Sequence, residues 1–199
     1  MGMPMGTCTL FGLLPGLVAA AVALGAAPVL DIGRVNAMDR AAFLETFGAV
    51  FENSPWVAER VLPERPFDSP KALHAAMMAA VRAAPAEERL RFLNAHPELA
   101  GAEARQRRMT AHSVAEQGSA GLDGLSEADL ARFDRLNAAY RQTFGFPFII
   151  AVRGRTQPEI LRTFEHRLEN TPEAEQEAAL AEIAAITHGR LERILGPFD

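Results

Sequence analysis

Apolar residues recur at helical spacing in nearly every segment after Met38, and this periodicity restricts the fold more than any other feature. Leu73, Met77 and Val81 stand at every fourth position, the spacing of one face of a helix. Other segments repeat the pattern, with the apolar residues Phe43, Phe47, Val50, Leu130, Phe133, Leu136, Tyr140, Ile160, Leu161, Phe164, Leu168, Leu180, Ile183, Leu191 and Ile194. The pattern predicts an all-α protein.

Residues that begin and end helices stand at the edges of these segments. Short polar side chains cap helix N-termini, proline fits the first helical position, and glycine ends helices. The start signals are Asp39, Ser69-Pro70, Ser126, a capping box at Thr156 to Glu159, and Thr171-Pro172, and the stop signals are Gly145 and Gly196. We predict a single compact domain of about eight helices.

The run from Phe146 to Val152 is apolar, and periodicity alone predicts a buried strand there. It contains Pro147, and no other segment of the chain offers a partner strand. We therefore expect one extended buried segment near 146–152 between two helices.

The first 37 residues differ from the rest of the chain. No charged residue occurs from Met1 to Leu30, and the apolar run from Leu10 is interrupted by glycine and proline. A secretory signal needs a positive n-region and a membrane span needs about 20 apolar residues. We favour a misassigned or non-native start over a signal, and a signal over a membrane anchor. We expect residues 1–37 to be a disordered or misassigned apolar extension and residues 38–199 to form the domain.

Composition excludes several classes of function. The net charge of −5 argues against a nucleic-acid binder. Cys8 is the only cysteine, so neither an intrachain disulfide nor a cysteine zinc site can form. Lys71 is the only lysine and follows a helix start, where exposure disfavours Schiff-base chemistry.

His96 is the first candidate for chemistry. It follows a helical run, and Pro97 disfavours helical geometry at the residue before it. The imidazole is therefore expected at a helix exit, and its ordinary pKa suits acid–base catalysis. A lone histidine is more often a packed or surface group, and that alternative stays open.

Ser113 and Glu116 have two interpretations. The S-x-x-E spacing is that of a capping box, and a carboxylate near a helix N-terminus also stays ionised and oriented for a ligand. His112 and Glu116 share a helical face, with His166 and His188 as further possible ligands, but H-E-x-x-H is absent. We predict no metal site.

Three motifs in order resemble one family. They are N-x-H-P-x-L-A at Asn94–Ala100, S-x-x-E-Q at Ser113–Gln117 and F-G-F-P-F-I-I at Phe144–Ile150. Together they resemble the OHCU decarboxylase family, over roughly Met38 to the C-terminus. OHCU is 2-oxo-4-hydroxy-4-carboxy-5-ureidoimidazoline, an unstable intermediate between urate and allantoin.

The resemblance implies roles for individual residues. It makes His96 the catalytic acid–base group and Glu116 the residue that orients the substrate, while Gln117 holds a polar ring edge. We also considered Arg190 as a fork for the substrate carboxylate, against the commoner solvated or ion-paired arginine. The expected substrate-binding residues are Pro97, Ser113, Glu116, Gln117, Phe148, Ile149, Ile150, Ala151, Val152 and Arg190.

The implied function is decarboxylation of OHCU to S-allantoin in urate degradation, without a cofactor. The resemblance further implies a homodimer; we expect a cytoplasmic location and no nucleic-acid or membrane partner. The alternative is a catalytically inactive helical module that binds a ligand or a partner. Convergence of His96, Ser113 and Glu116 on one pocket would favour the enzyme.

Overall fold

The computed structural model describes Gly2 and residues 29–199 except residue 107, and for Glu103 and Arg105 it describes the backbone only. Within these residues the chain forms helices and loops and no strand, as expected. The elements are α1 (Ile32–Asn36), α2 (Arg40–Phe47), α3 (Trp56–Val61), the 3-10 turn η1 (Leu62–Glu64), α4 (Pro70–Ala83), α5 (Ala86–Asn94), α6 (Ala102–Arg105), α7 (Ala111–Ser119), α8 (Glu127–Phe144), α9 (Gln157–Arg167) and α10 (Pro172–Leu195). No described helix is long and apolar enough to cross a membrane.

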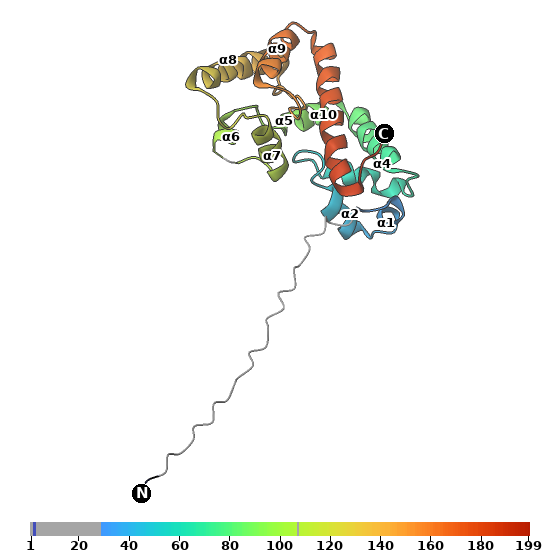
Figure 1. Cartoon of the computed structure of the whole chain (residues 1–199). Coiled ribbons are helices and arrows are strands. Elements are labelled where there is room, and N and C mark those ends of the chain that lie inside the picture. The colour runs from blue at the N-terminus through green and yellow to red at the C-terminus, as the bar shows by residue number, and fades with distance from the viewer. Residues whose placement is uncertain (1, 3–28, 107) are drawn as a thin grey trace.

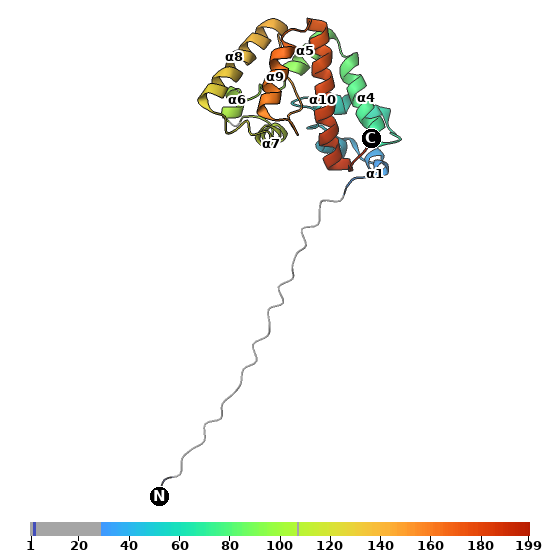
Figure 2. The ribbon, with the colours of Figure 1, turned by 45° about the horizontal axis from the view of Figure 1, so that its top comes forward.

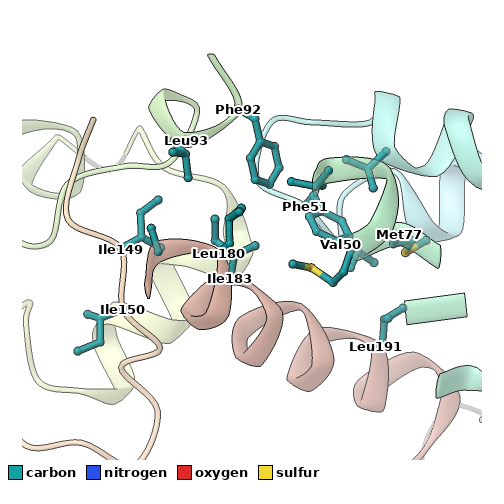
Figure 3. Close-up of a cluster of buried hydrophobic side chains, with 14 of the residues drawn as sticks. Val50, Phe51, Met77, Phe92, Leu93, Ile149, Ile150, Leu180, Ile183 and Leu191 are labelled. Atoms are coloured by element: carbon teal, nitrogen blue, oxygen red, sulfur yellow. The ribbon is translucent and has the colours of Figure 1, made fainter. Parts of the chain in front are cut away.

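The long helix α10 is the centre of the molecule. It contacts α4 on one side and α8 on another, while α8 and α9 pack together, an arrangement visible in two orientations (Figures 1 and 2). Its buried residues Leu180, Ile183 and Leu191 meet side chains from the other helices (Figure 3). Burial of such aliphatic side chains stabilises a fold by about 1.5–3 kcal/mol each.

The predicted helix boundaries are largely confirmed. The side chains of Asp39, Ser69, Ser126 and Thr171 each accept a backbone N–H at the start of their helices. Thr156 and Glu159 form the expected capping box. At the other end of α8, Gly145 adopts the left-handed conformation with φ of 78°, which favours glycine. The short helices α1 and α6 were not predicted.

The segment 146–152 is buried and has no regular secondary structure, as expected. Side chains supply the contacts that a sheet would otherwise provide. Phe148 stacks on Phe164 with ring centroids 3.9 Å apart. The Arg167 guanidinium donates to the Ile149 carbonyl at 2.7 Å, and the Glu182 carboxylate accepts the Ala151 N–H at 2.9 Å.

The expected boundary at Met38 is wrong for the residues just before it. Val35 in α1 is completely buried, and the Asn36 side chain exchanges two hydrogen bonds, both 2.8 Å, with the backbone of Phe67. Leu30 donates to the carbonyl of Ile194 at 3.0 Å. These residues therefore belong to the fold, whereas the expectation for residues 1 and 3–28 lies outside the described residues.

Candidate functional site

A tight turn follows α5 and presents His96. Ala100 has a φ of 51°, which is uncommon for a residue with a side chain. The side-chain oxygen of Gln117 accepts the Ala100 N–H at 3.0 Å. At Gly101, a Cβ would lie 2.7 Å from the Cβ of Glu98, so glycine is required there. The sequence H-P-E-L-A-G therefore encodes a specific, strained loop, of the kind that clusters at functional sites.

Two contacts determine the tautomer and the orientation of the His96 ring. Its Nδ1 lies 3.1 Å from the Phe92 carbonyl oxygen, which can only accept, so Nδ1 carries the hydrogen and Nε2 of the neutral ring is the free base. The ring also packs edge-on against Phe92, with centroids 5.4 Å apart. The ring at the helix exit therefore packs on the last turn of α5.

Burial lowers the pKa of His96 to about 4, although the carboxylate of Glu52 acts in the opposite direction. The charged form of imidazole is disfavoured wherever water is excluded. His96 is therefore neutral at neutral pH and can accept a proton at Nε2.

Helix α7 contributes Ser113, Glu116 and Gln117, but not through the capping box that we considered. Thr110 is the N-cap, and its hydroxyl oxygen accepts the Ser113 N–H at 3.3 Å. The cap interpretation of Ser113 and Glu116 is therefore wrong, because Ser113 lies inside the first turn. Both side chains are left for other contacts.

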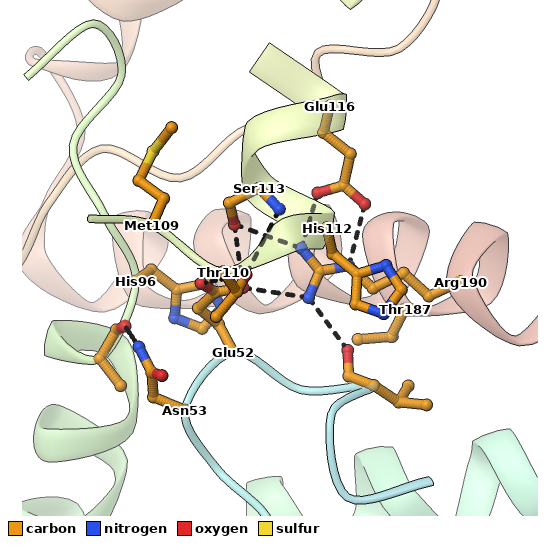
Figure 4. A network of polar contacts seen from close by, with 12 residues as sticks. Glu52, Asn53, His96, Met109, Thr110, His112, Ser113, Glu116, Thr187 and Arg190 are labelled. Atoms are coloured by element: carbon orange, nitrogen blue, oxygen red, sulfur yellow. Dashed lines mark hydrogen bonds and ion pairs between the residues drawn. The ribbon is translucent and has the colours of Figure 1, made fainter. Parts of the chain in front are cut away.

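Glu116 forms a two-pronged ion pair with Arg190, drawn in Figure 4. Nε and Nη2 of Arg190 donate to the two carboxylate oxygens at 2.9 and 2.6 Å. Arg193 adds a contact at 3.4 Å. The Glu116 side chain is 20% exposed whereas that of Arg190 is 3% exposed, so Glu116 is the part of this pair that a ligand can reach.

Arg190 is committed to protein acceptors. Besides Glu116, its Nη1 donates to Glu52 at 3.1 Å and to the Val50 carbonyl at 3.2 Å. Burial opposes its charge, but the two carboxylates outweigh that effect and raise the pKa of Arg190. The arginine fork that we considered for a substrate carboxylate thus holds Glu116 and Glu52 in this structure.

Glu52 was missed by the sequence analysis. It is 1% exposed and accepts hydrogen bonds from the hydroxyls of Thr110 at 2.7 Å and Ser113 at 2.9 Å. The available signal was an acidic residue directly after the apolar pair Val50-Phe51 in a helix-breaking stretch. A buried carboxylate of this kind needs partners, and its three donors are the N-cap residue of α7, Thr110, together with Ser113 of α7 and Arg190 of α10.

Gln117 is largely occupied by the turn that presents His96. In addition to its bond with Ala100, its amide nitrogen contacts the Glu98 carbonyl at 3.4 Å and the sulfur of Met109 at 3.2 Å. Gln117 therefore fixes the 96–101 turn against α7, as well as facing the pocket.

One pocket unites almost all of the expected site residues. It is a hollow of about 390 Å³, including space open to solvent. Its lining residues are His96, Pro97, Leu99, Ser113, Glu116, Gln117, Phe148, Ile149, Ile150, Val152, Ile186 and Arg190. Leu99 and Ile186 were not predicted. Ala151 does not line this pocket, but it lines a neighbouring one that shares Glu116 and Ile150.

The residues considered as metal ligands have other contacts. The Arg193 guanidinium lies 3.5 Å from His112 and 3.4 Å from Glu116. It therefore occupies the position between these two side chains that a metal ion would need. His166 faces Glu169, and His188 contacts the Phe198 carbonyl. In the described part of the chain, no three His, Cys, Asp or Glu side chains are grouped to hold a metal.

The pocket combines a neutral base, an oriented carboxylate and an apolar wall. Such a site can bind a small polar ring, accept a proton from it at the Nε2 of His96, and exclude water from one of its faces. Such an arrangement is compatible with acid–base catalysis on a small polar ligand.

Comparison with known proteins identifies relatives of this chain. The OHCU decarboxylase family model matches residues 36–192. The 2-oxo-4-hydroxy-4-carboxy-5-ureidoimidazoline decarboxylase of Haloferax volcanii is 41% identical over 162 residues, which are 81% of this chain and 94% of the relative. The mouse protein of the same name is 38% identical over 84% of this chain and 94% of its own length.

Two crystal structures are similar. One is of an (S)-allantoin synthase, with a TM-score of 0.66 and 30% identity over 83% of this chain and 54% of the other. The second is of an OHCU decarboxylase in the presence of (S)-allantoin, with a TM-score of 0.58 and 26% identity over 77% of this chain and 99% of the other.

Proposed function

This chain belongs to the OHCU decarboxylase family, and on that premise we propose that it decarboxylates OHCU to S-allantoin in urate degradation. The observation that supports this most strongly is the convergence of His96, Ser113 and Glu116 on a single pocket. The two relatives described above share the name of this activity, and the reaction suits a site that offers acid–base groups and an apolar wall.

The substrate supplies its own electron sink. When the bond between the ring carbon and the carboxylate breaks, carbon dioxide leaves and the electron pair moves into the adjacent ring C=N bond. The hydroxyl on the same carbon loses its proton and becomes a carbonyl. The neighbouring carbon, which bears the ureido group, gains a proton and becomes the stereocentre of allantoin. The nitrogen of the former C=N bond also gains a proton. Two protons are therefore gained and one is lost, so one proton is consumed overall for each carboxylate lost.

In this mechanism His96 is the acid–base group. With a pKa near 4 in the free protein it is present as the neutral base, and Nε2 takes the proton of the substrate hydroxyl. The imidazolium that results is a strong acid in its buried surroundings, so it returns a proton readily to the substrate. Because His96 stands at one side of the pocket, proton delivery from that side gives one enantiomer.

Glu116 orients the substrate and Arg190 orients Glu116. Each oxygen of Glu116 accepts one hydrogen bond from Arg190, and a carboxylate has further lone pairs for a ligand hydroxyl or N–H. Arg190 thus acts through Glu116. Pro97, Gln117 and the segment Phe148 to Val152 form the walls that fix the ring.

Charge balance in the site favours loss of the substrate carboxylate. Glu52 and Glu116 offset Arg190 and the nearby Arg193, which leaves no surplus cation. An anion placed against the apolar wall of Phe148, Ile150 and Ile186 is poorly solvated. A poorly solvated carboxylate is raised in free energy, and its conversion to neutral carbon dioxide removes this unfavourable contribution.

We further propose that the protein acts without a cofactor, as a cytoplasmic homodimer. The family resemblance supports the cofactor and oligomer proposals, and light scattering of the purified protein tests the oligomer.

The decisive assay generates OHCU in situ from urate and follows its disappearance. An active decarboxylase consumes OHCU faster than it decays spontaneously, in proportion to protein concentration. A protein that binds allantoin yet leaves the decay rate unchanged would instead be an inactive binding module, and the proposed function would be wrong.

A further inference from the structure

We propose that Glu52 is a positioning residue of this site, which makes Ser113 a hydrogen-bond acceptor toward the pocket and so selects a ligand that presents an N–H there. The proposal rests on the decarboxylase function above and deepens it, because it assigns a specificity-determining role to a residue outside the pocket lining.

The first step is the direction of the hydrogen bonds. A serine hydroxyl has one proton, and the Ser113 hydroxyl donates it to Oε2 of Glu52 at 2.9 Å. An ionised carboxylate only accepts, so the proton cannot be turned toward the pocket while Glu52 stays in place. Arg190 approaches Ser113 Oγ only at 3.5 Å. A lone pair of Ser113 therefore remains for a ligand.

The second step is that Glu52 itself cannot reorient. Its other oxygen accepts the Thr110 hydroxyl at 2.7 Å, and Oε2 is also held by Arg190 at 3.1 Å. With 1% exposure it has no access to water. Figure 4 shows Glu52 entering from the loop opposite α7 and α10, between Ser113 and Arg190.

The third step is what such an acceptor recognises. A site built to hydrogen-bond one partner rejects analogues that lack it, because its buried polar group is left unpaired. OHCU and allantoin both contain ring amide and ureido N–H groups, which a serine acceptor can bind. An ether or carbonyl oxygen at the same place would face a second lone pair and be disfavoured.

The test is a double-mutant cycle of Glu52→Met and Ser113→Ala. Methionine is similar in length but has no carboxylate, so Ser113 loses its acceptor and becomes free to donate to the pocket. Glutamine would not serve, because Arg190 can only donate and therefore holds the amide oxygen at the Oε2 position, where it still accepts from Ser113. We expect the KM for OHCU to rise about tenfold, the effect of one lost hydrogen bond, with kcat within about twofold and the protein folded in a thermal melt. The double variant should be no worse than Ser113→Ala alone. Glu59→Met, the same change in an exposed ion pair with Arg40, is the matched control and should leave KM unchanged.

An unchanged KM in Glu52→Met, or strictly additive effects in the cycle, would overturn the proposal. If Glu52→Met does not fold, calorimetry with (S)-allantoin and its N-methylated analogues decides. The native protein should bind one N-methyl analogue about tenfold more weakly than (S)-allantoin. Ser113→Ala should bind the two compounds equally well. If Ser113→Ala still prefers (S)-allantoin, the proposal fails. If the native protein shows no turnover, the decarboxylase function is refuted instead. The role of Glu52 can then still be tested by comparing the affinity for allantoin of the native protein with that of Glu52→Met.

Discussion

His96 has its charge and its tautomer set by its surroundings. The Phe92 carbonyl takes the Nδ1 hydrogen, and burial keeps the ring neutral. The sequence indicated the position of His96 correctly, but it could not indicate the shifted pKa, because burial depends on residues distant in the chain. Because the pKa of His96 is lowered, the expected pH dependence of activity changes.

Activity should persist to lower pH than an ordinary histidine would allow. His96 must be deprotonated to act as a base, and its pKa in the free protein is about 4. We expect kcat/KM for OHCU to stay level from pH 8 to about pH 5 and to fall as the pH approaches 4. Initial rates at limiting substrate measure this. A decline centred near pH 6.5, the ordinary histidine value, would show that His96 is not the titrating base.

Glu116→Gln should reduce both turnover and stability. The variant leaves the buried Arg190 with one carboxylate fewer. We expect a loss of about 1–3 kcal/mol in the free energy of unfolding, measured by urea denaturation, and lower activity per folded molecule. The helix content should be unchanged, because Thr110 caps α7. Native stability together with native turnover would contradict both roles of Glu116.

At the scale of elements, the pocket lies where the extended segment 146–152 meets α7, α10 and the turn that follows α5. The segment 146–152 forms one wall, and Arg167 of α9 and Glu182 of α10 hold its backbone. Arg167 also lies over the Phe148 ring at 4.7 Å and pairs with the buried Glu175. These contacts explain how a segment with no ladder of hydrogen bonds can still present a defined surface.

Removal of the Glu182 carboxylate should loosen this wall. Glu182→Ala leaves the Ala151 N–H without its acceptor, and we expect the free energy of unfolding to fall by about 1–3 kcal/mol. Glu182→Gln retains an acceptor oxygen and should lose less. Urea denaturation of both variants measures the difference, and equal losses would indicate that the ion pair with Arg155, not the bond to Ala151, is what matters.

At the scale of the whole molecule, local patterns predicted more than long-range pairs. Caps such as Asp39 and Thr171 and the all-α class depend on residues close in sequence, and they are confirmed. The pairing of Arg190 with Glu52 joins positions 138 residues apart. No local pattern encodes such a pair. The family resemblance therefore predicts a list of site residues but not the ion-pair network that orients them.

Residues 29–37 should contribute measurably to stability. A protein that starts at Met38 loses the buried Val35 and both Asn36 hydrogen bonds. We expect its midpoint of thermal unfolding to fall by about 5 °C or more. A protein that starts at Val29 is the matched control, and we propose that it melts like the full chain. Equal midpoints for the Met38 protein and the control would show that α1 packs against the domain without stabilising it.

The optical activity of the allantoin formed is the most direct test of the central claim. OHCU is generated in situ from urate, and circular dichroism of the product is followed with the native protein, with His96→Asn and without protein. Acid–base catalysis is typically worth about 10²–10⁴-fold, so the native protein should give S-allantoin rapidly. His96→Asn, folded by thermal melt, should give the racemic product at the spontaneous rate. Racemic allantoin from the native protein, or optically active allantoin at the native rate from His96→Asn, would contradict the proposed mechanism.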